Sequence, residues 1–309
     1  MPPRLGFVTA ALLAATGLLA TACSAGNAAG SAGGGVITAV GAENEYANVI
    51  GQIGGRYVKV TAIESNPNTD PHSFEASPSV AQQVSTAQLV VQNGIGYDTY
   101  MNKIEAAAPS SSRKVIVVQN LLGLPDSTPN PHLWYSPKTM PAVAKAVAKD
   151  LSALDPAHAK YFTANVSKFD ASLQPWYQAI AQFKAAYPGT PVAVTEPVGD
   201  YMLQAAGTSI LTPFTFQAEI MNGVDPSPQD VSLQNGLFTG HRVKVFVYNQ
   251  QVTDSLTASL LNLAHKEGIP VVGVYETMPT PGYDYQSWML AEVRALQKAV
   301  TDKTSTVKL

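Results

Sequence analysis

The chain contains 309 residues, with 19 basic and 22 acidic side chains that give a net charge of −3. This length is sufficient for one large or two medium domains with a sizeable core. Because the net charge is small and the Lys and Arg residues are scattered, we expect no nucleic-acid partner.

The N-terminal segment has the pattern of an export signal. Residues 1–22 contain a single charged side chain, Arg4, followed by an apolar stretch and then small residues. Thr, Gly and Ala dilute the apolar stretch, so it predicts a signal peptide rather than a membrane-spanning helix.

Cys23, the only cysteine, ends the sequence LLATAC, which resembles the lipobox of bacterial lipoproteins. We therefore expect Cys23 to be lipidated; the alternative is an incidental cysteine beside an ordinary cleavage site. Residues 23–35 consist largely of Gly, Ala and Ser, which predicts a flexible tether. The sequence thus predicts a globular body held close to a membrane.

Short β-branched or apolar runs alternate with helical patterns from residue 36 onward. These runs cover residues 36–40, 58–63, 89–94 and 114–120. Strands that alternate with helices indicate a mostly parallel sheet with helices on its faces. We expect residues 36–154 to form an N-terminal α/β lobe of this kind.

A long helical pattern follows at residues 155–188. Asp155 is a candidate N-cap, and Pro156 suits the first helical position. Apolar residues then recur at steps of three or four, although Pro175 interrupts the helix and is expected to bend it. The pattern predicts a linking helix between two lobes.

The alternation of strands and helices resumes in residues 189–309. The clearest strands are 191–196, 243–249 and 271–276, and the clearest helices are 254–268 and 285–301. We therefore predict a C-terminal α/β lobe, and for the whole body two α/β lobes with mostly parallel sheets joined by one long helix.

Four residues able to ligate a metal follow predicted strands directly or across a short turn. They are His72, His132, Glu196 and Glu276. Ligands of parallel sheets bind at the carboxyl ends of the strands, so facing lobes would bring these side chains together. Two neutral imidazoles and two carboxylates form a complete shell for a divalent cation, and the carboxylates balance its charge.

Each of these residues also has a structural interpretation, since a lone loop histidine is usually solvated and either glutamate could cap a helix. The other three histidines are expected to be structural or surface residues: His158, His241 and His265. Reserve ligands are Asp70, Asp200 and Asp284. We take Asp284 as the most serious alternative among them.

Five motifs together resemble one known family. They are DPHSFEASP (70–78), NPHLWYSP (130–137), TEPVGDY (195–201), GVDPSPQDVS (223–232) and VYE (274–276). The chain resembles the metal-binding solute-binding lipoproteins of manganese and zinc ABC importers over about residues 36–301.

The resemblance implies two lobes joined by a single rigid helix, with a metal bound between them. It also implies delivery of the metal to a membrane permease driven by a cytoplasmic ATPase, from an extracytoplasmic, lipid-anchored position. We expect a monomer. The implied ligands are His72, His132, Glu196 and Glu276. The family's last ligand is commonly Asp followed by Ser, whereas this chain has Glu276 and Thr277, so Glu276 and Asp284 remain alternatives for the fourth ligand.

The sequence favours manganese over zinc as the transported ion. Zinc-associated members often have a third histidine where this chain has Glu196, and residues 121–131 contain no histidine. Manganese accepts more oxygen ligands than zinc, although zinc binds a given site more strongly in the divalent series.

Two other functions remain as alternatives. A lipid-anchored zinc-dependent hydrolase could use the same cleft, but a fourth protein ligand would occupy the open position that catalytic zinc needs. The second alternative is a binding protein for an organic solute, in which Trp134 and Tyr135 would line the cleft.

Overall fold

The computed structural model describes residues 35–309. The predicted signal peptide, Cys23 and nearly all of the tether lie outside the described residues, and these interpretations stay predictions. Within the described part of the chain, no helix combines the length and the apolar composition needed to cross a membrane.

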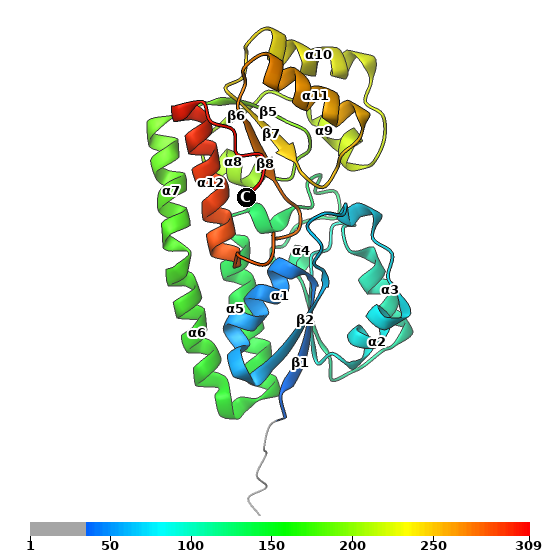
Figure 1. Cartoon of the computed structure of the whole chain (residues 1–309). Coiled ribbons are helices and arrows are strands. Elements are labelled where there is room, and N and C mark those ends of the chain that lie inside the picture. The colour runs from blue at the N-terminus through cyan, green and yellow to red at the C-terminus, as the bar shows by residue number, and fades with distance from the viewer. Residues whose placement is uncertain (1–34) are drawn as a thin grey trace, which may run out of the picture. The chain divides into compact units, whose positions relative to one another are not determined.

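The body contains two four-stranded sheets, and all of their strand pairs are parallel (Figure 1). The first sheet has the order β2-β1-β3-β4, with β1 at Ile37–Glu43, β2 at Val58–Glu64, β3 at Leu89–Gln92 and β4 at Lys114–Val117. The second has the order β6-β5-β7-β8, with β5 at Pro191–Val194, β6 at Ser209–Ile210, β7 at Val245–Asn249 and β8 at Val271–Val274. The α/β prediction with mostly parallel sheets is confirmed.

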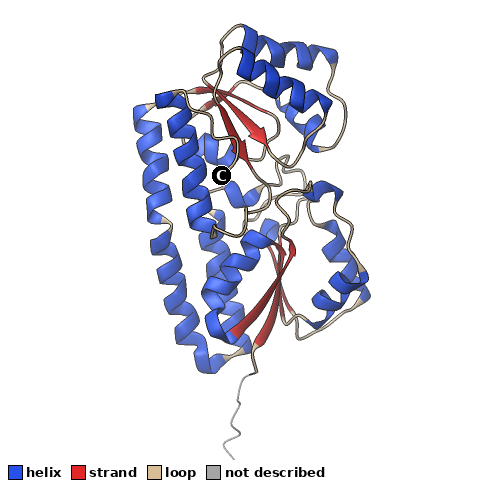
Figure 2. Ribbon diagram, in the orientation of Figure 1, coloured by secondary structure: helices blue, strands red, loops and turns tan. Residues whose placement is uncertain are grey.

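Helices surround both sheets, as Figure 2 shows. Those before the linking segment are α1 (Asn44–Gly54), η1 (Gly55–Tyr57), η2 (Pro71–Ser73), α2 (Pro78–Thr86), α3 (Thr99–Ala107), α4 (Val118–Leu121), η3 (Leu133–Tyr135) and α5 (Thr139–Leu154). Those after it are α8 (Asp200–Ala205), α9 (Phe214–Met221), α10 (Pro228–Thr239), α11 (Ser255–Lys266) and α12 (Tyr285–Asp302).

The strand predicted at 114–120 is three residues too long, because β4 ends at Val117 and the short helix α4 follows. The pairing strand β3 ends at Gln92, which is the partner of Val117, so the ladder has nothing further to pair with. Gln119 instead holds the loop after β3, where its side-chain Oε1 accepts a hydrogen bond from the Ile95 N–H at 2.7 Å.

The linking segment consists of η4 (Pro156–His158), α6 (Ala159–Ser172) and α7 (Gln174–Ala186). Pro175 lies in the first turn of α7, so the expected interruption falls at Leu173. Helix α6 packs against α5 and α1, and α7 packs against α12 and α8 (Figure 1). The segment therefore contacts both lobes along its length.

One continuous apolar core crosses from lobe to lobe. It includes Ile50 and Val147 of the first lobe, Trp176 of the linking segment, and Val194 and Trp288 of the second lobe. Trp288 is fully buried, and its ring lies 5.6 Å from that of Tyr135. This shared packing keeps the loops at the carboxyl ends of the two sheets in contact with each other.

Candidate metal centre

His72 lies on the short turn η2, between β2 and α2. The Asp70 carboxylate accepts a hydrogen bond from the His72 backbone N–H at 2.8 Å, and Pro71 fixes the backbone at the first position of the turn. The imidazole of His72 remains 22% exposed. The turn thus holds this ring at the solvent side of the cleft.

His132 immediately precedes η3 and is fully buried. Its Nδ1 lies 2.8 Å from the Asn130 Oδ1, which also accepts a hydrogen bond from the His132 backbone N–H. Because an amide oxygen only accepts, the ring proton belongs on Nδ1. The lone pair of the neutral ring is therefore on Nε2, as a metal ligand requires.

Glu276 lies two residues beyond β8 and meets both imidazoles. Its Oε2 is 3.1 Å from His72 Nε2, 3.1 Å from His132 Nε2, and 3.0 Å from the Tyr97 hydroxyl that donates to it. One donor atom from each of His72, His132 and Glu276 lies within 4.8 Å of the other two. Two ligands that are each about 2.1 Å from one ion stand roughly 3.0–3.4 Å apart. The two separations of 3.1 Å between an imidazole and the Glu276 carboxylate therefore suit a shared metal ion.

Glu196 lies two residues beyond β5 and is 2% exposed. Asn249, the last residue of β7, donates from its Nδ2 to Glu196 Oε1 at 3.1 Å and to Glu276 Oε1 at 2.8 Å. One amide thus holds the two carboxylates close together. Among the described residues, Glu196 Oε2 has no hydrogen-bond partner.

The electrostatics of the centre follow from burial and from these pairings. Burial alone would raise the pKa of Glu276, but the adjacent His72 and His132 outweigh it and hold that pKa well below its ordinary value. Burial and repulsion by Glu276 raise the pKa of Glu196 well above its ordinary value.

The two imidazoles respond in opposite ways. Burial opposes a charge on His72, yet the Glu276 carboxylate outweighs that effect and raises the His72 pKa. Burial lowers the pKa of His132. A divalent cation would replace the protons that these buried groups otherwise share.

Aromatic rings enclose the imidazoles on the first-lobe side. The ring of Tyr97 lies 5.0 Å from that of His72 and 5.8 Å from that of His132, and the Trp134 ring lies 5.4 Å from that of His132. Tyr97 is 8% exposed and Trp134 is fully buried. These rings exclude water from one side of the centre and fix the His132 plane.

The reserve ligands take other roles. Asp284 is the N-cap of α12, and its Oδ1 accepts a hydrogen bond from the Ser287 N–H at 2.9 Å. Asp284 and Glu196 both lie outside the group of His72, His132 and Glu276, but Glu196 shares the Asn249 amide with Glu276, whereas the Asp284 carboxylate is used as a cap. Asp70 caps the turn of His72. Asp200 lies in the first turn of α8, where burial raises its pKa to about 7.

The other three histidines lie away from the centre. His158 pairs with Asp155 at 2.6 Å and stacks on Tyr57, with ring centroids 3.8 Å apart. His241 is exposed, and His265 lies in the last turn of α11.

Three amide residues around the centre were not found from the sequence: Asn130, Asn249 and Gln251. Gln251 Oε1 accepts from the Glu276 N–H at 2.6 Å, and its Nε2 donates to the Thr69 carbonyl oxygen at 2.6 Å, which ties β8 to the His72 loop. Amide side chains do not titrate, so the pattern of metal-capable residues in the sequence does not include them. Asn249 nevertheless ends a predicted strand, which is the same kind of position that Glu196 and Glu276 occupy.

The whole body matches a family of known proteins. Residues 40–299 match the family described as zinc-uptake complex component A, periplasmic. The chain belongs to this family. The family is described by its part in zinc uptake, and this description does not favour the hydrolase or the organic-solute alternative.

Individual relatives agree with this assignment. The chain is 28% identical over 179 residues to the manganese-binding lipoprotein MntA of Bacillus subtilis, covering 55% of this chain and 56% of that protein. The chain thus spans about half the length of the curated relatives it matches.

Solved structures share the fold. The periplasmic zinc-binding protein TroA of Treponema pallidum superposes with a TM-score of 0.73 at 17% identity, over 87% of this chain and 100% of that one. A periplasmic metal-binding protein of Candidatus Liberibacter asiaticus gives a TM-score of 0.69 at 18% identity, over 85% of this chain and 99% of that one.

Proposed function

We propose that this protein captures a divalent transition metal between its two lobes and delivers it to the permease of an ABC importer driven by a cytoplasmic ATPase. The observation that carries the proposal is the meeting of His72 and His132 from the first lobe with Glu276 from the second, at 3.1 Å each. Nitrogen donors from the first lobe and an oxygen donor from the second lobe converge on one position. An ion bound there would hold the two lobes together.

The proposed ligands are His72, His132, Glu196 and Glu276. Glu196 supports this set because its buried Oε2 has no partner among the described residues, and Asn249 holds its carboxylate beside that of Glu276. Asp284 is disfavoured as a ligand, since its carboxylate caps α12.

The favoured ion is Mn2+ rather than Zn2+. Two carboxylates offer up to four oxygens beside two imidazole nitrogens, which suits an ion that accepts six ligands and many oxygens. Zinc sites usually have four ligands. Relatives named for each metal occur, as MntA and TroA illustrate.

The proposed location is extracytoplasmic, with a monomer anchored to the cell membrane through a lipid on Cys23. The sequence of residues 1–23 supports export and lipidation. The B. subtilis relative is named as a lipoprotein, which agrees with this proposal. Residues 36–154 and 189–309 would form the two lobes, with 155–188 as the link.

Metal analysis of protein purified without chelator tests the proposal, followed by competition between Mn2+ and Zn2+ on the metal-free protein. We expect one ion that stays bound through purification, and Mn2+ added to the metal-free protein should raise the thermal unfolding temperature. The proposal fails if neither ion binds, or if the His132→Ala variant binds the ion as tightly as the unchanged protein.

A further inference from the structure

A pocket of about 360 Å3 adjoins the loop that carries His72. Glu64, the loop residues Thr69 and Phe74, and Thr277 are among the residues that line it. None of the four proposed metal ligands lines this pocket, but Pro71, Ser73 and Thr277, which flank His72 and Glu276, do. The pocket therefore lies beside the candidate metal centre and does not include its ligands.

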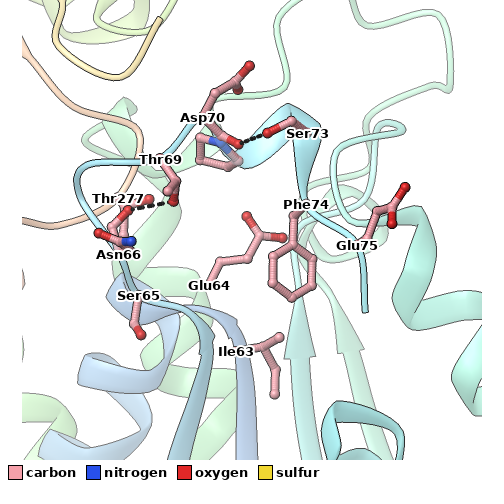
Figure 3. Close-up of a pocket in the computed structure, with 11 residues that line it drawn as sticks. Ile63, Glu64, Ser65, Asn66, Thr69, Asp70, Ser73, Phe74, Glu75 and Thr277 are labelled. Atoms are coloured by element: carbon pink, nitrogen blue, oxygen red, sulfur yellow. Dashed lines mark hydrogen bonds between the residues drawn. The ribbon is translucent and has the colours of Figure 1, made fainter. Parts of the chain in front are cut away.

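Glu64, the last residue of β2, has a buried carboxylate that points into this pocket. Figure 3 shows the carboxylate directed toward the loop of Thr69 and Asp70, beside the Phe74 ring. Glu64 is 5% exposed, and neither of its side-chain oxygens has a partner at an ordinary hydrogen-bond distance among the described residues, although the Tyr100 hydroxyl lies near enough to stabilise the charged form. Burial raises the pKa of Glu64 to about 9. A buried carboxylate without a partner is costly unless it takes up a proton or a cation.

Glu43 lies next to Glu64 on the neighbouring strand. The two residues are direct partners in the parallel register of β1 and β2, so their side chains leave the same face of the sheet. Glu43 is 2% exposed, and its two oxygens also lack partners in the described part of the chain. Burial and the nearby carboxylates, including Glu64, raise the pKa of Glu43.

A third buried carboxylate, Glu45, increases the negative charge. It is fully buried and belongs to the first turn of α1, and its two oxygens have no partner among residues 35–309. Burial is the main cause that raises the pKa of Glu45, and repulsion by Glu64 and Glu276 raises it further. None of these three carboxylates forms a side-chain ion pair with a Lys or Arg within residues 35–309 that would compensate its charge.

We propose a second cation site at this pocket, in which Glu64 of the pocket lining and its strand partner Glu43, which does not itself line the pocket, hold a hydrated divalent ion of the magnesium or manganese type. Small hard cations keep several waters and are bound through one or two carboxylates. The volume of the pocket accommodates an ion with its waters, since one water occupies about 30 Å3. The Thr69 and Thr277 hydroxyls could orient those waters.

The ligand chemistry separates this site from the first one. Among the described residues, His72, His132 and Glu276 are the group of three whose donor atoms already lie close together. The Glu64 site has oxygen donors and waters only, which disfavours zinc and favours Mg2+. It is independent of the proposed function of the centre.

Mn2+ titration followed by electron paramagnetic resonance, which counts free Mn2+, tests the second site on the metal-free full-length protein. We expect two bound equivalents, with millimolar Mg2+ displacing one of them. Glu64→Gln and Glu43→Gln should each lose the Mg2+-sensitive equivalent or weaken it on the order of tenfold or more. Glu75→Gln removes an exposed carboxylate from the same pocket and should retain both equivalents.

The other variants make the two sites distinguishable. His132→Ala should lose the Mg2+-resistant equivalent and keep the Mg2+-sensitive one. The Mg2+-sensitive equivalent supports the second site even if the first site binds no metal. Thermal unfolding without divalent ions checks folding, and Glu64→Gln should be at least as stable as the unchanged protein because it removes an unpaired buried carboxylate. A single equivalent in the unchanged protein that His132→Ala removes would overturn the proposal. The proposal would also be overturned if both the Glu64→Gln and the Glu43→Gln variants kept the Mg2+-sensitive equivalent at unchanged affinity.

Discussion

The two lobes hold their proposed ligands in different ways. The first lobe supplies His72 and His132 from short turns, each ordered by a neighbouring polar side chain that accepts the histidine's backbone N–H. The second lobe supplies Glu196 and Glu276 immediately beyond the ends of β5 and β8, with Asn249 of β7 donating to both. The carboxylate half of the centre is thus built on the sheet, and the imidazole half is built on loops.

Exposure differs as well. Glu276 and His132 are fully buried, whereas the His72 side chain is 22% exposed. A ligand on an exposed turn can leave the ion at a smaller cost than one fixed among buried rings. We therefore infer that the second lobe and His132 form the pre-organised part of the centre, and that release of the ion begins at His72.

The largest effect is expected from Glu276→Gln, which removes the group that both imidazoles meet. Metal binding should be lost, and the metal-free protein should be destabilised by about 3 kcal/mol because a buried charged pair is broken. Calorimetric titration and denaturant unfolding measure the two effects. Glu196→Gln is the matched control, since its carboxylate has a raised pKa and takes up a proton readily. It should weaken binding and leave the metal-free stability unchanged or higher, and equal loss of stability in both variants would contradict the comparison.

His132→Ala should weaken binding by more than the roughly 10–100-fold that residues outside the ligand shell contribute. His72→Ala should also abolish the thermal stabilisation by metal.

The His72→Ala substitution should mainly accelerate release of the ion, because the His72 ring lies at the solvent side of the cleft. Stopped-flow transfer of the ion to a chelator measures release. His265→Ala, on the surface of α11, should behave as the unchanged protein, and equal release rates for the two histidine variants would argue against a gate at His72.

Asn249→Ala tests the support that the second lobe gives to its carboxylates. Loss of the amide leaves Glu196 and Glu276 without their shared donor, so affinity should fall about 10–100-fold. The affinity is measured by competition with a chelating dye. Asn222→Ala is a suitable control, because the exposed Asn222 side chain donates a hydrogen bond to the Ala218 carbonyl oxygen of its own helix. If both variants kept full affinity, Asn249 would have no positioning role.

Lower pH should weaken metal binding through the first lobe. The pKa of His72 is raised above the ordinary histidine value of about 6.5, so protons already compete with the metal ion for this ring at pH values above 6.5. As the pH falls through the pKa of His72, its imidazole becomes charged and cannot ligate, so the affinity at pH 5.5 should be at least roughly tenfold below that at pH 7.5. Titrations at these two pH values check the sign, and a higher affinity at pH 5.5 would exclude His72 as a ligand.

The sequence predicted the fold class because buried parallel strands leave continuous apolar runs, as in residues 271–274 and 245–249. It could not place the end of β4, since that depends on where its partner β3 stops. It also missed β6, Ser209–Ile210, which is too short to leave a pattern.

The sequence identified the candidate ligands for a different reason. His72, His132, Glu196 and Glu276 follow strands and fall within the motifs of a known family. Their supporting amides depend on contacts between segments far apart in the chain, such as that of Gln251 with Thr69. No local pattern records such a contact, so these residues required the three-dimensional structure.

The smallest effect is expected from Tyr201→Phe, which tests how firmly the second lobe steadies the first. The Tyr201 hydroxyl donates to the Asn130 carbonyl oxygen at 2.9 Å, and the Asn130 Nδ2 donates to the Pro197 carbonyl oxygen at 2.7 Å. Loss of one neutral hydrogen bond costs about 1 kcal/mol. Affinity should therefore fall by at most about fivefold, which is the loss expected if the whole cost falls on the metal-bound form. Tyr177→Phe is the matched control. The Tyr177 hydroxyl donates a hydrogen bond of the same length, 2.9 Å, to the Pro137 carbonyl oxygen, and this bond does not involve the metal centre. An affinity loss in the Tyr177 variant equal to that in the Tyr201 variant would mean that general stability is responsible, and that the orientation of His132 by Asn130 does not depend on the second lobe.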